Sequence, residues 1–253
     1  MSRPTRAPPT LRPGQAARAS SPTKVSRHGP SRRIEATFGF VDLAGFTALT
    51  EAHGDFDAAD VATRFAELTR AALGPRDRLV KTIGDAVLLT SPTPETALGL
   101  VDRLLTSAAG EKALPALRAG LHHGPAIERD GDVFGAAVNL AARVAAEAYA
   151  GEVLVTEGIA AVAREQGLPV VEIGLVPLKN VSQATALSSL GFMVGATESE
   201  VDPVCQAVVD RRAAAGQLCY EHTAYWFCSL TCAAAFASNP QWHVSNRVRA
   251  PRE

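Results

Sequence analysis

Cysteine is scarce in this sequence and confined to one region. All four cysteines of the 253-residue chain lie between positions 205 and 232. That distribution excludes a disulfide framework for the whole chain and makes the cysteines a local feature. Apolar runs long enough to cross a bilayer are also missing, because the apolar segment 136–150 is interrupted by Asn139, Arg143 and Glu147. We therefore expect no membrane span, and the N-terminus lacks the apolar core of a signal peptide.

Acidic residues are absent from the first 33 positions, which hold eight arginines and lysines. The net charge of the whole chain is −1, so this segment carries +8 and the remainder −9. The segment has few large apolar side chains and cannot bury enough surface to offset the entropy lost on ordering. We predict that 1–33 is a disordered basic tail. A solvated tail is favoured over one that binds a membrane or nucleic acid, and we expect no nucleic-acid partner.

Beyond the tail, the apolar pattern switches repeatedly between the periods of strands and helices. Strands are predicted at 36–41, within 78–90, at 116–128 with a break near Gly124-Pro125, and at 152–156, 170–178 and 185–191. Helices are predicted at 44–52, 57–73, 93–109, 134–149 and 157–166. With a hairpin turn at Gly84-Asp85, this order predicts an α+β sandwich in which helices cover a mainly antiparallel sheet.

The chain divides into one large domain and one small module. The alternating elements fill residues 34–192, whereas 193–201 lack periodicity and are predicted to be a linker. Residues 202–246 contain every cysteine and several aromatic side chains, so we expect a small cysteine-containing module there. Residues 247–253 are predicted to be a short tail.

In the stretch 38–49, a carboxylate lies between a predicted strand and a predicted helix. The first apolar strand ends at Asp42, Gly45 allows a tight turn, and Phe46 and Leu49 begin a helical period. A carboxylate at a strand end can hold Mg²⁺, while the free N–H groups of the helix start face phosphate oxygens. Taken alone, the stretch fits equally well an aspartate that only caps a helix.

Three stretches together resemble the catalytic domain of class III nucleotidyl cyclases. They are Phe-Val-Asp-Leu-Ala-Gly-Phe-Thr at 40–47, Lys-Thr-Ile-Gly-Asp-Ala at 81–86, and Asp-Val-Phe-Gly at 132–135 followed by Val-Asn-Leu-Ala-Ala-Arg at 138–143. Each stretch alone is a weak signal, whereas their order and spacing together are highly specific. The resemblance covers about residues 35–192 and implies a ferredoxin-like cyclase sandwich.

The resemblance implies that Asp42 and Asp85, with Leu43 at the same site, hold two Mg²⁺ or Mn²⁺ ions. Cyclisation of a nucleoside triphosphate needs an activated 3′-hydroxyl and a neutralised pyrophosphate leaving group. Two divalent ions about 4 Å apart meet both needs. On its own, Asp85 is more simply explained as a hairpin-turn aspartate. Beside Asp42 and the third stretch, the metal-binding role is favoured.

The same resemblance assigns the substrate contacts. Lys81 and Asp132 resemble the pair that selects the base: a lysine can donate to adenine N1, and an aspartate can accept from the exocyclic amine. Guanylyl members carry Glu and a small residue or Cys at these positions, so the pair implies ATP. Lys179 resembles a triphosphate-binding lysine, although Asn180 replaces the glycine expected after it. The residues expected to bind phosphates after Asp42 are Ala44, Gly45, Phe46 and Thr47.

Asn139 and Arg143 are four residues apart and so share one helix face. The resemblance makes them catalytic, because an arginine can stabilise charge at the α-phosphate and an asparagine amide can position the ribose. The alternative for Arg143 is a solvated helical arginine, but an Ala-rich helix has no need of Asn139, a poor helix former. In this family these residues act on substrate held by the metals of the other subunit, so the resemblance implies a head-to-tail homodimer.

The C-terminal region 202–240 resembles the YHS domain, a small metal-associated module. The matching residues are Asp-Pro-Val-Cys at 202–205, Tyr-Trp-Phe-Cys-Ser-Leu-Thr-Cys at 225–232, Phe236 and Asn239-Pro240. Gln206-Ala207 departs from the usual Gly-Met. Cys205, Cys228 and Cys232 are expected to bind Zn²⁺ or Cu(I), with Cys219 or His222 as a fourth ligand. The alternative is that they are small apolar residues of a tiny core.

The expected function is that of a cytoplasmic adenylyl cyclase, forming cyclic AMP and pyrophosphate from ATP. A guanylyl cyclase is disfavoured by Lys81 and Asp132. An inactive cyclase-fold regulator that senses nucleotide or metal is disfavoured because all six catalytic positions hold the expected chemistry.

Overall fold

The computed structural model describes residues 29, 31–111, 114–192 and 199–245. Most of the predicted basic tail and of the predicted linker lies outside these ranges, as does the predicted C-terminal tail. Two boundaries differ from the predictions. Strand β1 begins at Arg32, inside the predicted tail, and strand β9 (Ser199–Val201) lies in the predicted linker.

An eight-stranded sheet forms the centre of the large domain, with the strand order β2-β3-β1-β4-β6-β8-β7 and with β5 paired to β4. Its pairs are antiparallel except for the parallel pair β4–β6. This confirms the expected mainly antiparallel sheet. The strands are β1 (Arg32–Leu43), β2 (Arg78–Ile83), β3 (Ala86–Ser91), β4 (Leu117–Arg129), β5 (Asp132–Phe134), β6 (Val153–Thr156), β7 (Val170–Val176) and β8 (Thr185–Leu190).

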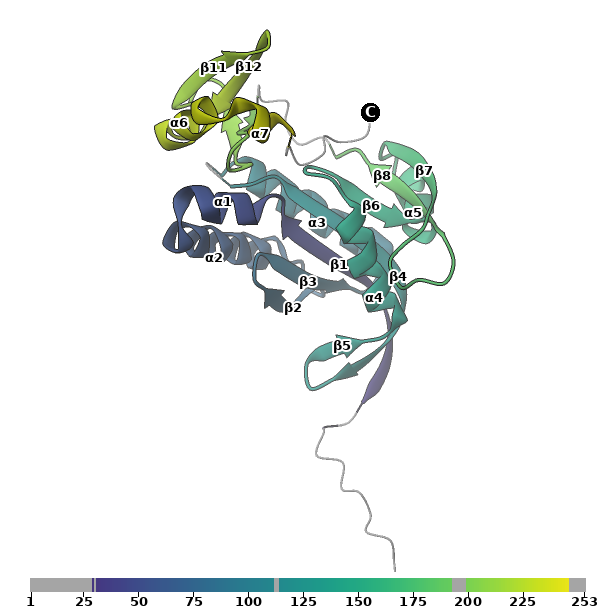
Figure 1. Ribbon diagram of the computed structural model, residues 1–253. Helices are drawn as coiled ribbons and strands as arrows, with labels where there is room; N and C mark the ends of the chain where they lie inside the picture. Colours follow the sequence, from purple (N-terminus) through teal and green to yellow (C-terminus); the bar gives the residue numbers. More distant parts are fainter. Residues whose placement is uncertain (1–28, 30, 112–113, 193–198, 246–253) are drawn as a thin grey trace, which may run out of the picture.

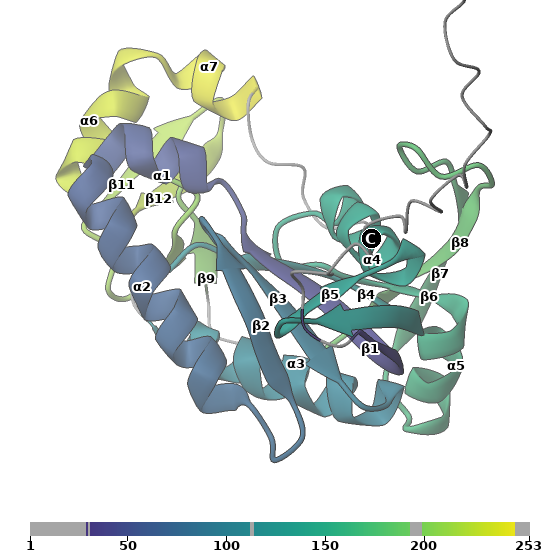
Figure 2. The ribbon, with the colours of Figure 1, turned by 90° about the horizontal axis from the view of Figure 1, so that it is seen from below.

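Helices cover both faces of this sheet (Figures 1 and 2). Alternate β1 side chains point to opposite faces. Val41 and Leu43 join the core formed with α2, α3 and α5, whereas Ala36 and Phe38 join the core formed with α4. The helices are α1 (Phe46–His53), α2 (Asp55–Ala72), α3 (Pro94–Ala109), α4 (Ala136–Glu147) and α5 (Glu157–Glu165). Among the described residues, no helix is long and apolar enough to cross a membrane.

One glycine allows α4 to lie directly on β4. A Cβ atom at Gly120 would stand 2.0 Å from the backbone nitrogen of Ala145 and 2.6 Å from the carbonyl carbon of Val144. Any side chain at this position would therefore push α4 off the sheet. The close contact fixes the helix that carries Asn139 and Arg143.

Strand β4 runs without a break through Gly124-Pro125, where the sequence predicts an interruption. Glu35 of β1 lies opposite Pro125 in a continuous register. The proline is tolerated because β6 pairs with β4 only at 119–121 and β5 only at 127–129, so among the described strands β1 alone pairs with this part of β4. A second difference follows: 132–134 forms β5, and α4 begins at Ala136 rather than at 134.

The β4–β5 connection is a tight turn at Asp130-Gly131. Both residues have positive φ, 51° and 80°, as a two-residue hairpin of the primed type requires. Asp-Gly is a preferred sequence for such a turn, although this hairpin is not among the predicted elements. The turn places Asp132 at the start of β5, next to β2.

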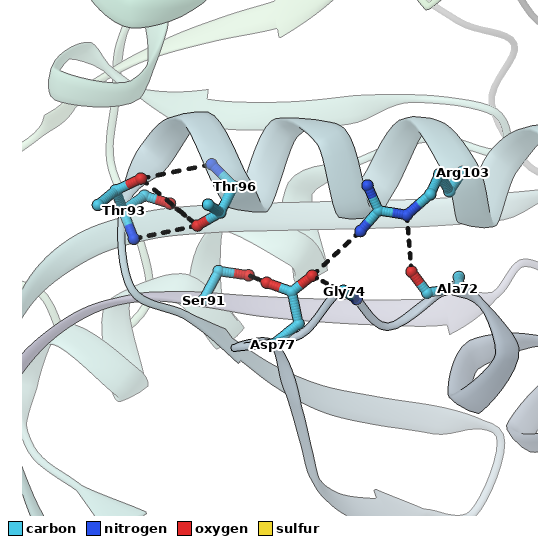
Figure 3. Close-up of polar contacts among 7 residues, drawn as sticks. All are labelled: Ala72, Gly74, Asp77, Ser91, Thr93, Thr96 and Arg103. Atoms are coloured by element: carbon cyan, nitrogen blue, oxygen red, sulfur yellow. Dashed lines mark hydrogen bonds and ion pairs between the residues drawn. The ribbon is translucent and has the colours of Figure 1, made fainter.

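A buried carboxylate joins α2, α3 and the β2–β3 hairpin (Figure 3). Asp77 Oδ2 accepts hydrogen bonds from Gly74 N at 2.8 Å and Arg103 Nη2 at 3.1 Å, and its Oδ1 accepts from Ser91 Oγ at 2.7 Å. Arg103 Nε also donates to Ala72 O at 2.8 Å, at the end of α2. These contacts fix the hairpin that carries Asp85 against both helices.

Helix α3 begins with a reciprocal cap, also drawn in Figure 3. Thr96 N donates to Thr93 Oγ1 at 3.4 Å, and Thr93 N donates to Thr96 Oγ1 at 3.2 Å. The cap satisfies N–H groups that have no acceptor within the helix, which explains why α3 begins at Pro94, one residue after the predicted start at 93.

The C-terminal module is small and packs against the large domain. Its core contains Phe227 and Phe236 together with Leu49 of α1 and Ala58 of α2. Both views place it over α1 (Figures 1 and 2). Its remaining elements are β10 (Val208–Asp210), β11 (Gly216–Tyr220), β12 (Thr223–Phe227), α6 (Leu230–Ser238) and α7 (Pro240–Ser245).

Candidate active site

Two carboxylates meet at the end of β1. Asp42 is the penultimate residue of β1, and Asp85 lies in the β2–β3 turn. The backbone carbonyl of Asp85 accepts a hydrogen bond from Leu43 N at 3.3 Å. Burial and the neighbouring Asp42 raise the pKa of Asp85. Asp42 Oδ1 is buried and has no hydrogen-bond partner among the described residues. Crowded carboxylates with an unpaired buried oxygen have the chemistry of a divalent cation site.

Arg118 is a site residue that the sequence reasoning missed. It lies opposite Asp42 in the β1–β4 register, and its Nε donates to Asp42 Oδ2 at 2.8 Å. A second donor of the same guanidinium, Nη2, also contacts this oxygen. Only the strand register reveals this contact, because no local pattern marks Arg118 in the sequence.

The turn after Asp42 can bind an anion at the N-terminus of α1, although the N–H of Ala44 cannot take part. Gly45 has φ 76° and precedes α1, whose first helical bond runs from Leu49 N to Gly45 O at 3.0 Å. The N–H groups of Phe46 and Thr47 therefore have no acceptor within the helix. Ala44 differs, because its N–H donates to Ala116 O at 2.8 Å. That N–H is not available to a phosphate as the sequence reasoning expected.

Lys81 on β2 and Asp132 on β5 lie close together because the two strands are neighbours. Lys81 Nζ donates to Asp132 Oδ2 at 2.6 Å, and Val133 N donates to Asp132 Oδ1 at 2.8 Å. The hydrogen bond from Lys81 lowers the pKa of Asp132. Both side chains remain partly exposed. The two residues therefore form one polar unit that is open to a ligand.

Neither Asn139 nor Arg143 makes a hydrogen bond or ion pair with the paired carboxylates in the described part of the chain. Helix α4 runs along β4 from Ala137, beside Gly124, to Ala145, beside Gly120. Gly124 lies opposite Ala36 and Gly120 opposite Phe40, so the helix approaches the Asp42 end of β1 at its C-terminal half. Asn139 is exposed and Arg143 half-buried, and within the described residues neither side chain makes a hydrogen bond or ion pair.

The structure likewise does not bring Lys179 to the carboxylates. It lies in the connection between β7 and β8 and is exposed. Its side chain makes no hydrogen bond or ion pair in the described part of the chain. His122 of β4 is half-buried, and its Nδ1 lies 2.9 Å from Thr156 Oγ1.

A second cluster of metal-ligating side chains lies between the module and α1. It contains Cys205, Cys228 and Cys232, as the sequence predicts, together with His53. The two residues predicted as a fourth ligand are both exposed and outside the cluster: Cys219 pairs with Ala224 in the β11–β12 ladder, and His222 follows in the turn. The sequence reasoning missed His53 because it belongs to the large domain.

Known proteins match most strongly in the large domain. Residues 30–189 match the family described as the adenylate and guanylate cyclase catalytic domain. A pH-sensitive adenylate cyclase of Mycobacterium tuberculosis is 40% identical over 125 residues, which cover 49% of this chain and 32% of that protein. An adenylate cyclase of Streptomyces coelicolor is 37% identical over 123 residues, 48% of this chain and 32% of that protein. The match thus spans about a third of the length of these relatives.

Solved structures show the same fold. The adenylyl cyclase CyaB of P. aeruginosa superposes with a TM-score of 0.56 at 20% identity, covering 64% of this chain and 96% of that chain. The guanylate cyclase domain of RhGC from Catenaria anguillulae, in complex with GTP, gives 0.54 at 16% identity, covering 64% and 98%. The fold alone therefore does not distinguish the two nucleotides. The family match covers well over half of the sequence, and the chain belongs to the family of adenylate and guanylate cyclase catalytic domains.

Proposed function

We propose that this chain is an adenylyl cyclase that converts ATP to 3′,5′-cyclic AMP and pyrophosphate. The observation that carries the choice of ATP is the Lys81–Asp132 pair at 2.6 Å. An ammonium donor beside a carboxylate acceptor complements the N1 acceptor and the amine donor of adenine, whereas guanine presents the opposite pattern. The adenylate cyclases among the relatives of known sequence support the same substrate.

Asp42 and Asp85 are proposed to hold two Mg²⁺ or Mn²⁺ ions, with Leu43 beside them at the strand end. The fit rests on the buried Oδ1 of Asp42, which has no partner among the described residues, and on the raised pKa of Asp85, which reflects burial and the second carboxylate beside it. When bound, such ions activate the 3′-hydroxyl and neutralise the leaving pyrophosphate.

The other residues of the first stretch and Arg118 are proposed to bind the triphosphate. The N–H groups at Gly45, Phe46 and Thr47 precede the hydrogen-bonded part of α1 and carry the positive end of its dipole. The guanidinium of Arg118, already beside Asp42, presents further donors to phosphate oxygens. Lys179 is proposed as an additional triphosphate contact from the β7–β8 connection.

We propose that the active unit is a homodimer with shared sites. Arg143 is assigned to charge stabilisation at the α-phosphate and Asn139 to positioning the ribose, yet among the described residues neither side chain makes a hydrogen bond or ion pair with Asp42 or Asp85 of its own chain. A second chain would supply them. Phe134 and Ile83 support this arrangement, because these large apolar side chains are 52% and 47% exposed beside Asp132 and Gly84-Asp85.

The segment 202–246 is proposed to be a YHS-type module that regulates the cyclase domain without contributing residues to its active site. Its support is the arrangement of two small hairpins and one helix that bring Cys205, Cys228 and Cys232 together. Free thiols this close together are typical of a reducing compartment, so we propose a cytoplasmic location.

The direct test incubates the purified chain with ATP or GTP and with Mg²⁺ or Mn²⁺, and identifies the cyclic product by mass spectrometry. We expect cyclic AMP from ATP and little cyclic GMP. Asp42→Asn and Asp85→Asn should abolish turnover with both metals, while Asp102→Asn, an exposed carboxylate on α3, should not. Cyclic GMP as the main product would favour the guanylyl cyclase. A folded chain with no cyclic product would favour the inactive regulator.

A further inference from the structure

Four side chains with no part in the proposed cyclisation meet between the module and the large domain. Cys205, Cys228 and Cys232 come from the module, and His53 is the last residue of α1. His53 Nε2 lies 3.6 Å from Cys228 Sγ and 3.5 Å from Cys232 Sγ. The Sγ atoms of Cys205 and Cys228 are 3.3 Å apart, and those of Cys228 and Cys232 are 3.8 Å apart.

Three of these four separations match a tetrahedral zinc site, and the Cys205–Cys228 separation is about 0.5 Å shorter. With Zn–S bonds of about 2.3 Å and a Zn–N bond of about 2.0–2.1 Å, a regular tetrahedron has sulfur–sulfur edges of about 3.8 Å and sulfur–nitrogen edges of about 3.6 Å. All the ligand atoms lie within 4.8 Å of one another, and two of the four residues are buried. One cation at the centre of the cluster would reach all four without a large rearrangement.

We propose that Cys205, Cys228, Cys232 and His53 bind one Zn²⁺ ion, which joins helix α1 of the cyclase domain to the C-terminal module. Three thiolates and one imidazole form a recognised set of ligands for structural zinc. A ring nitrogen directed at two sulfurs is not explained if the cysteines serve only as small apolar residues. Cu(I) is selected mainly by soft sulfur ligands, so a fourth nitrogen ligand favours zinc.

The ligands are held in place by a buried second layer of contacts. Asp202 is fully buried, and its Oδ1 accepts from Val204 N at 2.8 Å, next to Cys205. Its Oδ2 accepts from Cys228 N at 2.8 Å, so one carboxylate fixes both segments that carry these cysteines. Cys232 N donates to Ser229 Oγ at 3.1 Å. Hydrogen bonds to the segments that carry the ligands are typical of metal sites and fix ligand orientation.

The cluster and its neighbouring residue contact both ends of α1. His53 ends the helix, and at its start Gln206, the neighbour of Cys205, packs against Gly45. The contact is so close that a Cβ on Gly45 would stand 2.3 Å from Gln206 Cγ. Zinc would therefore hold the module against the turn that follows Asp42. Only the link to catalysis rests on the proposed cyclase function; the zinc site itself does not.

The first experiment measures zinc and copper by mass spectrometry in the full-length chain purified under reducing conditions. We expect about one zinc ion per chain, and zinc-edge X-ray absorption should show three sulfur ligands and one nitrogen ligand. Cys228→Ser should lose the ion, whereas Cys219→Ser, which changes the exposed cysteine, should keep it. Absence of tightly bound zinc after reconstitution, or preference for Cu(I), would overturn the proposal.

His53 decides whether the ion joins the two parts of the chain. His53→Gln should lower the zinc affinity at least about tenfold, while His222→Gln, which changes an exposed histidine, should not. His53→Cys should restore tight binding with four sulfur ligands and so shows that any loss is not caused by misfolding. If His53→Gln keeps the affinity and absorption spectrum of the wild type, the bridging role is wrong.

Hydrogen exchange in α1 provides a readout that needs no ATP. Removing zinc with a chelator should speed exchange in the segment 46–53 of the wild type, and adding zinc back should reverse the change. Unchanged exchange would overturn the proposed hold on α1 even if cyclase activity is present. Restored protection without cyclase activity would leave the zinc proposal standing and count against the proposed function alone.

Discussion

Two nitrogens of the Arg118 guanidinium contact one oxygen of Asp42, while the other oxygen of that carboxylate is buried without a partner among the described residues. The two groups lie opposite each other on β1 and β4. A cation that binds Asp42 through Oδ1 leaves the Arg118 contact in place, whereas one that uses Oδ2 displaces it. Either way, the arginine stays within the proposed metal and triphosphate site.

Arg118→Ala should lower kcat/KM for ATP by about 10- to 100-fold, because a charge-assisted hydrogen bond to phosphate contributes about 1.5–3 kcal/mol. The metal concentration for half-maximal activity should not rise, since the substitution removes a competitor for Asp42. Arg64→Ala, which breaks surface ion pairs with Glu67 on α2 and with Glu111 after α3, is the control arginine outside the site. Steady-state kinetics at several metal concentrations make the comparison. A higher metal requirement would mean that Arg118 helps metal binding instead.

Exchanging the Lys81–Asp132 pair should change nucleotide preference. Lys81→Glu combined with Asp132→Cys replaces the donor and acceptor that fit adenine, so the ratio of kcat/KM for ATP to that for GTP should fall by about 10²-fold or more. The measurement is cyclic product formed from each nucleotide alone and in competition. An unchanged ratio in a folded variant would show that other residues select the base.

Shared sites can be tested by mixing two inactive chains. Asp42→Ala lacks a proposed metal ligand and Arg143→Ala lacks the proposed transition-state donor, so a mixed dimer has one doubly defective site and one intact site. Random exchange should restore about a quarter of the wild-type activity, since half the dimers are mixed and each has one good site. If mass spectrometry shows mixed dimers and activity stays absent, each chain must form its own site.

His122 should make folding stability depend on pH. Burial and the neighbouring His123 lower the pKa of His122 in the folded chain, and its Nδ1 lies 2.9 Å from Thr156 Oγ1. The unfolded chain therefore binds more protons as pH falls below the ordinary histidine range, about 6.5, and stability declines in that direction. In urea unfolding, the free energy of unfolding should fall less between about pH 7.5 and 5.5 in His122→Gln than in the wild type. His222→Gln should show the same fall as the wild type. Equal slopes in all three proteins would contradict this role.

Local patterns in the sequence were sufficient for much of the fold. Strand and helix periods located most elements, and the Gly84-Asp85 turn signal placed Asp85 at a hairpin tip, as the structure confirms. The break predicted at Gly124-Pro125 was wrong because a proline is excluded from a strand only where a neighbouring strand pairs on the side to which its N–H would point. Which neighbours β4 has at that point is a property of the whole sheet.

Contacts between distant segments were beyond the sequence patterns. Arg118 meets Asp42 through strand register, and His53 meets cysteines more than 150 residues further along the chain. Neither residue stands in a motif. The fourth ligand was sought inside the module at Cys219 or His222, because sequence spacing favours local partners. The packing of the module on α1 supplied a different one.

The contact between Gly45 and Gln206 makes a prediction about how the module and the cyclase domain are coupled. Gly45→Ala adds a methyl group 2.3 Å from Gln206 Cγ at a residue with φ 76°. Gly167→Ala is the matched control, because that residue follows the C-terminus of α5 with φ 75° and has nothing within 4 Å of the added group. The control should cost about 1–2 kcal/mol for the left-handed backbone. Gly45→Ala should cost more, because the clash adds to this strain.

Gln206→Gly should remove that additional cost. Gln206 itself has φ 63°, so glycine relieves its backbone strain while opening space above residue 45. In a double-mutant cycle of unfolding free energies, Gly45→Ala and Gln206→Gly should show a favourable coupling of about 0.5–3 kcal/mol, whereas Gly167→Ala and Gln206→Gly should be additive. Additivity in both pairs would mean that the module does not rest on the turn after Asp42 in solution, and that zinc occupancy has no direct path to that turn.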